Sequence, residues 1–231
     1  MTPEENKEAS TESAPKCDQQ FVRDIIEAFA RFADADDDYT NSHSFRVAYY
    51  TRLLAAELGC DEPTIERCYY AALLHDVGKN SIPKHILMKD GRLTDDEFEI
   101  MKQHPIHGYE ILKTITSAPE IAEAAACHHE RPDGKGYPRG LKGDEIPRIA
   151  QIIAVADTFD AMYSDRPYRD RMNFEHAVSI IRDGINTQFF EDVVEAFLSL
   201  VDKGYFRAKD DLGGGCTEDI TNIASQARKP A

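Results

Sequence analysis

The hydrophobic residues of this chain follow helical rather than strand periodicity. Apolar positions recur at intervals of three or four residues, and no stretch of strand length alternates apolar with polar positions. The helices predicted in this way cover residues 21–32, 41–58, 147–162, 174–182 and 190–201. Within the third of them, Ile149, Ile153 and Asp157 follow one another at intervals of four, so a carboxylate continues an apolar face toward the interior. The pattern predicts an all-α fold with a long irregular loop over residues 131–146.

A further helix is expected between Asp61 and Gly78. The side chain of Asp61 can cap the helix N-terminus, and Pro63 suits its first turn. Gly78 is a natural stop signal. The helix would therefore carry His75 and Asp76 in its last turn.

Two capping boxes mark helix starts in the middle of the chain. Thr94 with Glu97 and Ser117 with Glu120 both have the spacing at which side chain and backbone cap each other. Proline disfavours helical backbone in the residue before it, so the helix from Thr94 is expected to end or bend before Pro105.

Composition divides the chain into a core and two tails. Residues 1–17 contain few apolar side chains and are predicted to be a disordered leader. Residues 18–207 are expected to form one domain. Residues 208–231 begin near three consecutive glycines and are predicted to be a flexible tail.

Charge and cysteine usage exclude several functional classes. A net charge of −15 over 231 residues argues against binding to DNA or RNA duplexes. No apolar run is long enough to cross a bilayer, and the first twenty residues contain no signal-peptide core, so no membrane association is expected. The 5 cysteines are scattered without a C-x-x-C pair, which is typical of reduced thiols in a cytoplasmic protein.

Seven imidazoles and carboxylates are predicted to converge at helix ends and buried faces. They are His43, His75, Asp76, His104, His128, His129 and Asp157. A single histidine on an apolar face is usually a hydrogen-bonded core residue, and a single aspartate at a helix end is usually a cap. Five histidines and two inward-pointing acids, however, cannot all be buried cheaply without cations. A nitrogen and oxygen ligand set without thiolates favours two Fe or Mn ions, with Mg, Ni or Zn as alternatives.

Other residues are candidates for binding phosphate or a base. Lys79 could neutralise phosphate charge beside the metals, or it could simply interact favourably with a helix C-terminus. Lys142, Arg166 and Arg169 are further phosphate candidates, and Tyr137 could stack on a base.

The motifs around these residues resemble those of the HD-GYP family, a branch of the HD metal-dependent phosphohydrolases. The resemblance covers about residues 21–207. The matching motifs are Tyr39-Thr40-x-x-His43-Ser44-x-Arg46-Val47, Leu74-His75-Asp76-Val77-Gly78-Lys79, Met101-Lys102-x-His104-Pro105, His128-His129-Glu130-Arg131-x-Asp133-Gly134-x-Gly136-Tyr137-Pro138 and Ala156-Asp157-x-Phe159-Asp160-Ala161. The resemblance implies an HD-domain helical bundle with additional C-terminal helices. It also implies hydrolysis of the bacterial second messenger cyclic di-GMP to pGpG or GMP.

The resemblance also implies a role for each motif residue. One metal would be held by His43, His75, Asp76 and Asp157, and Asp76 would bridge to a second metal held by His104, His128 and His129. Lys79 and Asp160 would lie beside the metals, and Tyr137, Arg166 and Arg169 would contact the nucleotide. Some relatives hold a third metal through a glutamate at the position of Tyr39, so two metals are expected here.

Three alternatives remain open at this point. The substrate could be another cyclic dinucleotide such as cyclic GMP-AMP, or the chain could be a different HD-type enzyme, a nucleotidase or a ppGpp hydrolase. The chain could instead be a sensor or docking module that binds the dinucleotide without turnover. Members of this family often follow a receiver or sensory module, and none precedes residue 21. The chain is therefore expected to act alone or with signalling partners, or to be a piece of a longer protein.

Overall fold

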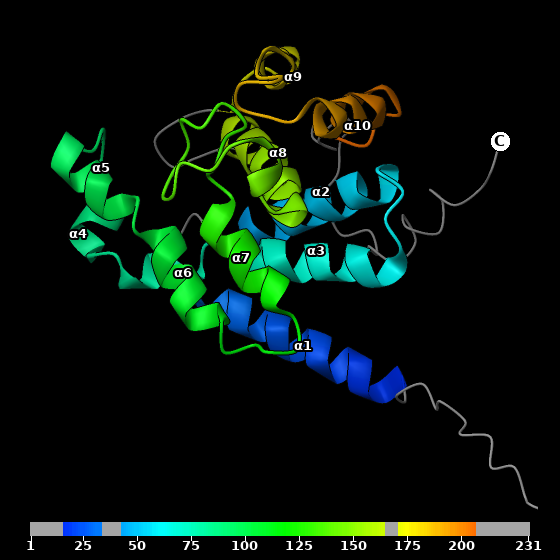
Figure 1. Ribbon diagram of the computed structural model, residues 1–231, viewed down its shortest axis with the longest axis horizontal. Coiled ribbons are helices and arrows are strands. Elements are labelled where there is room, and N and C mark those ends of the chain that lie inside the picture. The colour runs from blue at the N-terminus through cyan, green and yellow to red at the C-terminus, as the bar shows by residue number, and fades with distance from the viewer. Residues whose placement is uncertain (1–15, 34–42, 165–170, 207–231) are drawn as a thin grey trace, which may run out of the picture.

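The computed structural model describes residues 16–33, 43–164 and 171–206, and these residues form helices and turns without a sheet. The all-α prediction is confirmed (Figure 1). The α-helices are α1 (Lys16–Ala33), α2 (His43–Glu57), α3 (Glu62–Leu74), α4 (Lys84–Leu87), α5 (Asp95–Met101), α6 (His104–Leu112), α7 (Pro119–Cys127), α8 (Arg148–Tyr163), α9 (Phe174–Asp183) and α10 (Glu191–Asp202). Two 3₁₀ helices, η2 (Val77–Ser81) and η3 (Gly143–Glu145), lie between them.

The helices pack around a central group made of α2, α3, α7 and α8 (Figure 1). Helix α6 lies against both η2 and α7, so it closes one side of this group. The C-terminal helices α9 and α10 pack on α8, and α10 also contacts α2. Helix α1 runs along α3, and the short helices α4 and α5 lie together at one end of the molecule.

The core is centred on α8. Ile152, Ile153 and Phe159 are fully buried, and each contributes about 2 kcal/mol relative to an exposed side chain. The Phe159 ring lies edge-on to Phe206 and tilted against Phe197, with ring centroids 5.3 and 5.2 Å away. This packing fixes α8, and so fixes the direction of the polar residues on the same helix.

The observed helix ends can be compared with the capping signals in the sequence. Asp61 caps α3 through a hydrogen bond from the Thr64 backbone N–H at 3.0 Å, as predicted. Thr94 forms its capping box, and α5 ends at Met101, before Pro105, as expected. The capping box at Ser117 was wrong: Ala118 is the N-cap of α7 and makes no side-chain cap, because Pro119 already sets the first helical residue.

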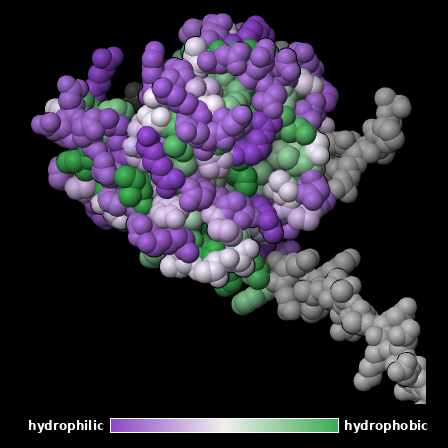
Figure 2. All heavy atoms as spheres, viewed as in Figure 1, coloured by the Kyte–Doolittle hydropathy of each residue, from purple (hydrophilic) through white to green (hydrophobic). Residues whose placement is uncertain are grey.

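The predicted ends of the domain are only partly described. Helix α1 begins at Lys16, inside the expected leader of residues 1–17, whereas residues 1–15 and the expected tail of residues 208–231 lie outside the described part of the chain. Among the described helices, none combines the length and the hydropathy that a membrane span requires. The face shown in Figure 2 is mostly hydrophilic, with hydrophobic residues in small separate groups.

Candidate metal centre and adjoining cavity

The junction of α3 and η2 positions the first pair of candidate ligands. Helix α3 ends at Leu74, earlier than the Gly78 signal suggested, so His75 is its C-cap and Asp76 leads into η2. Gly78 has a different role from the expected helix stop. A Cβ atom there would lie 2.0 Å from the carbonyl oxygen of His104. The missing side chain therefore lets η2 approach the start of α6, which brings His104 next to Asp76.

Three of the histidines are oriented by their own helices. In each of them Nδ1 lies 2.6–2.8 Å from the backbone carbonyl oxygen three residues earlier. These histidines are His75, His104 and His128. Because Nδ1 donates its proton to the carbonyl, the Nε2 lone pair is left for a metal ion.

The two carboxylate oxygens of Asp76 face two different sets of imidazoles. Oδ1 lies 3.3 Å from Nε2 of His104 and 3.8 Å from Nε2 of His128. Oδ2 lies 3.3 Å from Nε2 of His75 and 3.7 Å from Nε2 of His43. Asp76 therefore stands between two groups of nitrogen ligands, with one oxygen directed at each.

The potential ligand atoms fall into three groups whose members lie within 4.8 Å of one another. The groups are His104, His128 and His129; His43, His75 and Asp157; and His75, Asp76 and His128. Nε2 of His75 and Oδ1 of Asp76 are buried without a hydrogen-bond partner. Buried polar atoms without partners are costly, and bound cations would satisfy both of them. The residues present fit divalent metal ions, and the structure brings together all seven ligands expected from the sequence.

The imidazoles on one side of Asp76 are held neutral. Burial lowers the pKa of His104 to about 3 and that of His129 to about 4. Burial together with neighbouring His129 holds the pKa of His128 well below its usual value. Neutral imidazoles can coordinate metal without first losing a proton.

The other side of the cluster is rich in carboxylates. Burial alone would lower the pKa of His43, but hydrogen bonds with Asp157, Asp160 and Asp76 outweigh it and raise that pKa well above its usual value. For Asp76 the effects are reversed. Burial by itself would raise its pKa, but the interactions with His75 and Lys79 hold that pKa well below its usual range. The carboxylates are therefore ionised, as ligands of cations must be.

Asp160 supports His43 from behind. Its Oδ2 accepts a hydrogen bond from Nδ1 of His43 at 2.7 Å, on the ring edge opposite the metal-facing Nε2. Arg46 and Ser164 also donate to this fully buried carboxylate, at 2.6 Å and 2.9 Å. The sequence interpretation gave Arg46 no role. The geometry places Asp160 beside the candidate ligands, as the resemblance implied, in a position to orient His43.

Lys79 faces the cluster from η2. Its ammonium donates to Oδ2 of Asp76 at 2.5 Å. Helix α3 has already ended at Leu74, so Lys79 is not in its last turn. The position beside Asp76 puts a positive charge next to the candidate metal ligands.

The loop after α7 is organised by a buried carboxylate that the sequence interpretation assigned no role. Glu130 accepts hydrogen bonds from the backbone N–H groups of Arg139, Gly140 and Leu141, at 2.6, 3.2 and 3.0 Å. Gly136 lets the loop fold back closely, since a Cβ there would lie 2.5 Å from the carbonyl oxygen of His129. These contacts hold the following Tyr137 against the cluster.

The aromatic ring of Tyr137 packs against His129, one of the candidate metal ligands. Its ring stacks on that of His129 with a centroid distance of 4.7 Å and an interplanar angle of 29°. One face of Tyr137 is therefore already covered. Burial raises the pKa of its hydroxyl well above the usual value.

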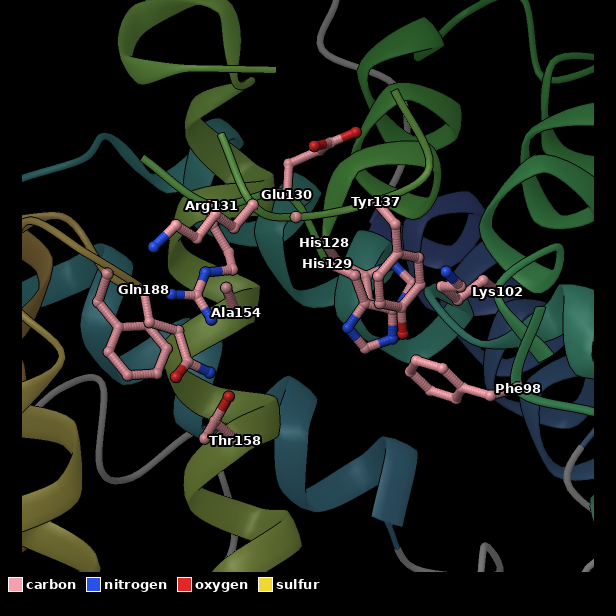
Figure 3. Close-up of a pocket in the computed structure, with 13 residues that line it drawn as sticks. Phe98, Lys102, His128, His129, Glu130, Arg131, Tyr137, Ala154, Thr158 and Gln188 are labelled. Carbon is pink, nitrogen blue, oxygen red and sulfur yellow. The ribbon is translucent and has the colours of Figure 1, made fainter. Parts of the chain in front are cut away.

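A cavity of about 330 Å³ adjoins the cluster on the side of His128, His129 and Tyr137 (Figure 3). The remaining lining residues are Phe98, Lys102, Glu130, Arg131, Lys135, Gly136, Ala154, Thr158, Gln188 and Phe189. Of these, Phe98 and Gln188 lie outside every motif, and Thr158 occupies an unspecified position of the motif around Asp157, so none of the three carried a sequence signal. Lys142 is not among the lining residues, and Arg166 and Arg169 lie outside the described residues, as does Tyr39.

The remaining histidines, His85, His107 and His176, belong to none of the candidate ligand groups found in the described residues. His85 and His176 are exposed, and His107 is half-buried. Cys127 is buried and belongs to none of the three groups found in the described residues.

An all-α fold with two clusters of histidines joined by one aspartate defines a class of helical metal-site proteins. A family model described as HD domain matches residues 27–191. The chain belongs to this family, and its motifs make it a member of the HD-GYP branch.

Curated relatives share the domain but are longer. The chain is 43% identical over 199 residues to a cyclic di-GMP phosphodiesterase of Thermotoga maritima, covering 84% of this chain and 54% of that protein. It is 39% identical over 170 residues to the 3'3'-cGAMP-specific phosphodiesterase 3 of Vibrio cholerae, covering 74% of this chain and 37% of that protein. The chain thus spans roughly half or less of these relatives.

Solved structures support the fold. The crystal structure of a cyclic GMP-AMP specific phosphodiesterase of Vibrio cholerae matches with a TM-score of 0.63 at 18% identity, covering 88% of this chain and 53% of that chain. An HDG"Y"P protein from Bdellovibrio bacteriovorus matches with a TM-score of 0.59 at 18% identity, covering 79% and 63%.

Proposed function

We propose that this chain is a metal-dependent phosphodiesterase that hydrolyses cyclic di-GMP to pGpG or GMP. The observation that carries the proposal is Asp76, whose two oxygens face separate groups of imidazoles. The names of relatives in the same family, several of them cyclic di-GMP phosphodiesterases, support the choice of substrate.

The cofactor proposed is a pair of divalent ions, Fe or Mn in preference to Mg, Ni or Zn. One ion would be held by His43, His75, Asp157 and Oδ2 of Asp76. The other would be held by His104, His128, His129 and Oδ1 of Asp76. Such a pair supplies positive charge to a phosphodiester and lowers the pKa of water at the site.

The chain's own residues bind and orient the substrate. The Lys79 ammonium lies beside Asp76, where it would offset the negative charge that develops on phosphate oxygens. Asp160 holds the imidazole of His43 in the tautomer that presents Nε2 to a metal. Arg166, Arg169 and Lys142 stay candidates for contacting the nucleotide.

A second candidate substrate is 3'3'-cyclic GMP-AMP. It is favoured by the relatives from Vibrio cholerae whose names specify cGAMP, at 35–41% identity. In either case the protein would lower the level of a second messenger in the cytoplasm, alone or together with signalling proteins.

The test is turnover by protein loaded anaerobically with Fe or Mn. We expect cyclic di-GMP to be converted to pGpG, and a parallel assay with 3'3'-cyclic GMP-AMP ranks the two substrates. Lys79→Ala should lower turnover while the metal content stays that of the wild type. Tight dinucleotide binding without turnover under any divalent ion would contradict the proposal and identify a sensor.

A further inference from the structure

The cavity beside the metal cluster has two chemically different walls (Figure 3). One wall carries Tyr137, Phe98 and Lys102, and the other carries Arg131, Thr158 and Gln188. The rings of His128 and His129 lie between them, so a phosphate at the metals would leave the rest of the ligand within this cavity. Its volume of about 330 Å³ lies at the lower end of small-molecule sites, which suits one nucleoside half of a dinucleotide.

Of the aromatic residues that line the cavity, Phe98 is the one whose side chain is exposed. The residue is 45% exposed, and the Lys102 ammonium lies over its ring, 5.3 Å from the ring centroid. It stands edge-on to Tyr137 with ring centroids 6.2 Å apart. Tyr137 is half-buried and stacked on His129, whereas Phe98 is exposed, so Phe98 is better placed than Tyr137 to receive a flat ligand.

Gln188 presents an amide from the opposite wall. Within the described part of the chain, no hydrogen bond engages this side-chain amide. Its backbone is fixed, because the carbonyl oxygen of Gly184 accepts hydrogen bonds from the N–H groups of Gln188 and Phe189 at 2.9 and 3.0 Å. Thr187 ties the same turn to the loop after α7 through a bond from the Asp133 N–H at 3.3 Å. A side-chain amide that is available as donor and acceptor and is held on a rigid turn is well suited to recognise a ligand by hydrogen bonding.

We infer that this cavity is a nucleobase subsite in which Phe98 stacks on the base and Gln188 hydrogen-bonds to its polar edge. The inference rests on the proposed function for the phosphate position. Stacking on Phe98 accepts any base, whereas an amide can pair with donors and acceptors of a purine edge. Gln188 would therefore set the preference between guanine and adenine, the difference that separates the two candidate substrates.

The stacking contact can be tested without turnover because the chain contains no tryptophan. Phe98→Trp introduces a single indole, and a stacked guanine quenches indole fluorescence. We expect GMP, which has no diester bond to hydrolyse, to quench the emission of Phe98→Trp on titration into metal-loaded protein. Ile100→Trp is the matched control, since Ile100 is also exposed on α5 but does not line the cavity. Equal responses of the two variants, or no quenching in either, would overturn the inference.

A kinetic experiment tests the same contact with the dinucleotide. Phe98→Ala should raise KM for cyclic di-GMP about 10-fold. Activity on bis(p-nitrophenyl) phosphate, a diester without a base, should stay unchanged. An equal loss on both substrates would mean that Phe98 supports the fold or the metal centre, and the subsite would be rejected.

The edge contact is tested by a change of selectivity. Gln188→Glu offers only acceptors, which suit the N1–H and N2–H₂ donors of guanine and repel the ring nitrogens of adenine. We expect the ratio of GMP to AMP affinity to rise on the order of 10-fold. Asn186→Asp adds the same charge in the same turn without lining the cavity, and it should leave the ratio unchanged. If the ratio of GMP to AMP affinity changes similarly in both variants, Gln188 does not distinguish the two bases.

The two proposals fail separately. If GMP quenches Phe98→Trp but no cyclic dinucleotide is turned over, the proposed nucleobase subsite is supported and the proposed phosphodiesterase activity is rejected. If the wild type turns over a cyclic dinucleotide but GMP does not quench Phe98→Trp, the phosphodiesterase activity is supported and the nucleobase subsite is rejected.

Discussion

Nδ1 of His43 lies 2.7 Å from Oδ2 of Asp160, although 117 positions separate the two residues. The carboxylate holds the imidazole so that Nε2 faces Asp76 and Asp157. A histidine oriented in this way has little freedom to turn away from a metal ion.

Weakening this support should weaken one metal site selectively. Asp160→Asn keeps the shape of the side chain but removes its charge, so we expect the affinity for one ion to fall 10- to 100-fold. Calorimetric titration of metal into stripped protein measures the effect. Ser164→Ala is the control, because it removes one donor to Asp160 and leaves the bond with His43. Identical binding isotherms for the two variants would contradict the orienting role.

Removing the shared ligand should affect both sites. Asp76→Ala takes away an oxygen from each group of imidazoles, so we expect elemental analysis to show the loss of both ions. Asp192→Ala removes a carboxylate of similar type that is paired with Arg148 at the surface, and it should keep the wild-type metal content. Retention of two ions by Asp76→Ala would exclude a bridging position.

Metal removal should lower the thermal stability of the whole domain. A ligand at one hundred times its Kd adds about 2.7 kcal/mol. For a chain of this size that corresponds to a Tm shift of about 5–10 °C. Differential scanning calorimetry before chelation, after chelation and after addition of Mn²⁺ checks the value. A Tm that does not change on chelation would mean that the cluster is satisfied without cations.

Replacement by alanine should lower the stability of the protein at Gly78 but raise it at the neighbouring Gly108. Gly78→Ala forces a Cβ to within 2.4 Å of the Gly108 backbone nitrogen, so we expect destabilisation of about 3 kcal/mol or more. Gly108→Ala meets its nearest neighbour at an ordinary 3.6 Å and gains helix propensity, so it should stabilise α6 by about 0.5–1 kcal/mol. Urea unfolding of both variants provides the comparison. Equal stabilities would show that η2 and α6 are not in close contact.

The buried thiols should react slowly below strongly alkaline pH. Burial raises the pKa of Cys68 to about 12 and that of Cys127 to about 11. The thiolate is the reactive form, so at pH 8 roughly one Cys127 side chain in a thousand is ionised. Peptide mass spectrometry after brief iodoacetamide treatment should find half-buried Cys60 labelled ahead of both. The labelling rates of Cys68 and Cys127 should rise with pH up to these values. Rapid labelling at pH 8 would contradict their burial.

Local patterns predicted most of the helices because helix formation depends on near neighbours. The expected helix over residues 147–162 is α8, and Asp61 and Thr94 cap their helices as predicted. The capping box at Ser117 failed for an equally local reason, since Pro119 determined where α7 begins. Motif spacing also identified the seven candidate ligands, because few other arrangements can bury so many imidazoles and acids.

Only the tertiary structure decided how these residues meet. The approach of η2 to α6 at Gly78 determines which oxygen of Asp76 faces His104, and no property of either segment alone specifies that contact. Phe98 and Gln188 come together across one cavity from α5 and the turn before α10, so neither is recognisable in its own segment. The residue types able to bind metal and phosphate were determined by the sequence itself. The arrangement of these candidate ligands on either side of Asp76, next to a cavity, arises from packing between distant segments, which depends on the shape of the whole core.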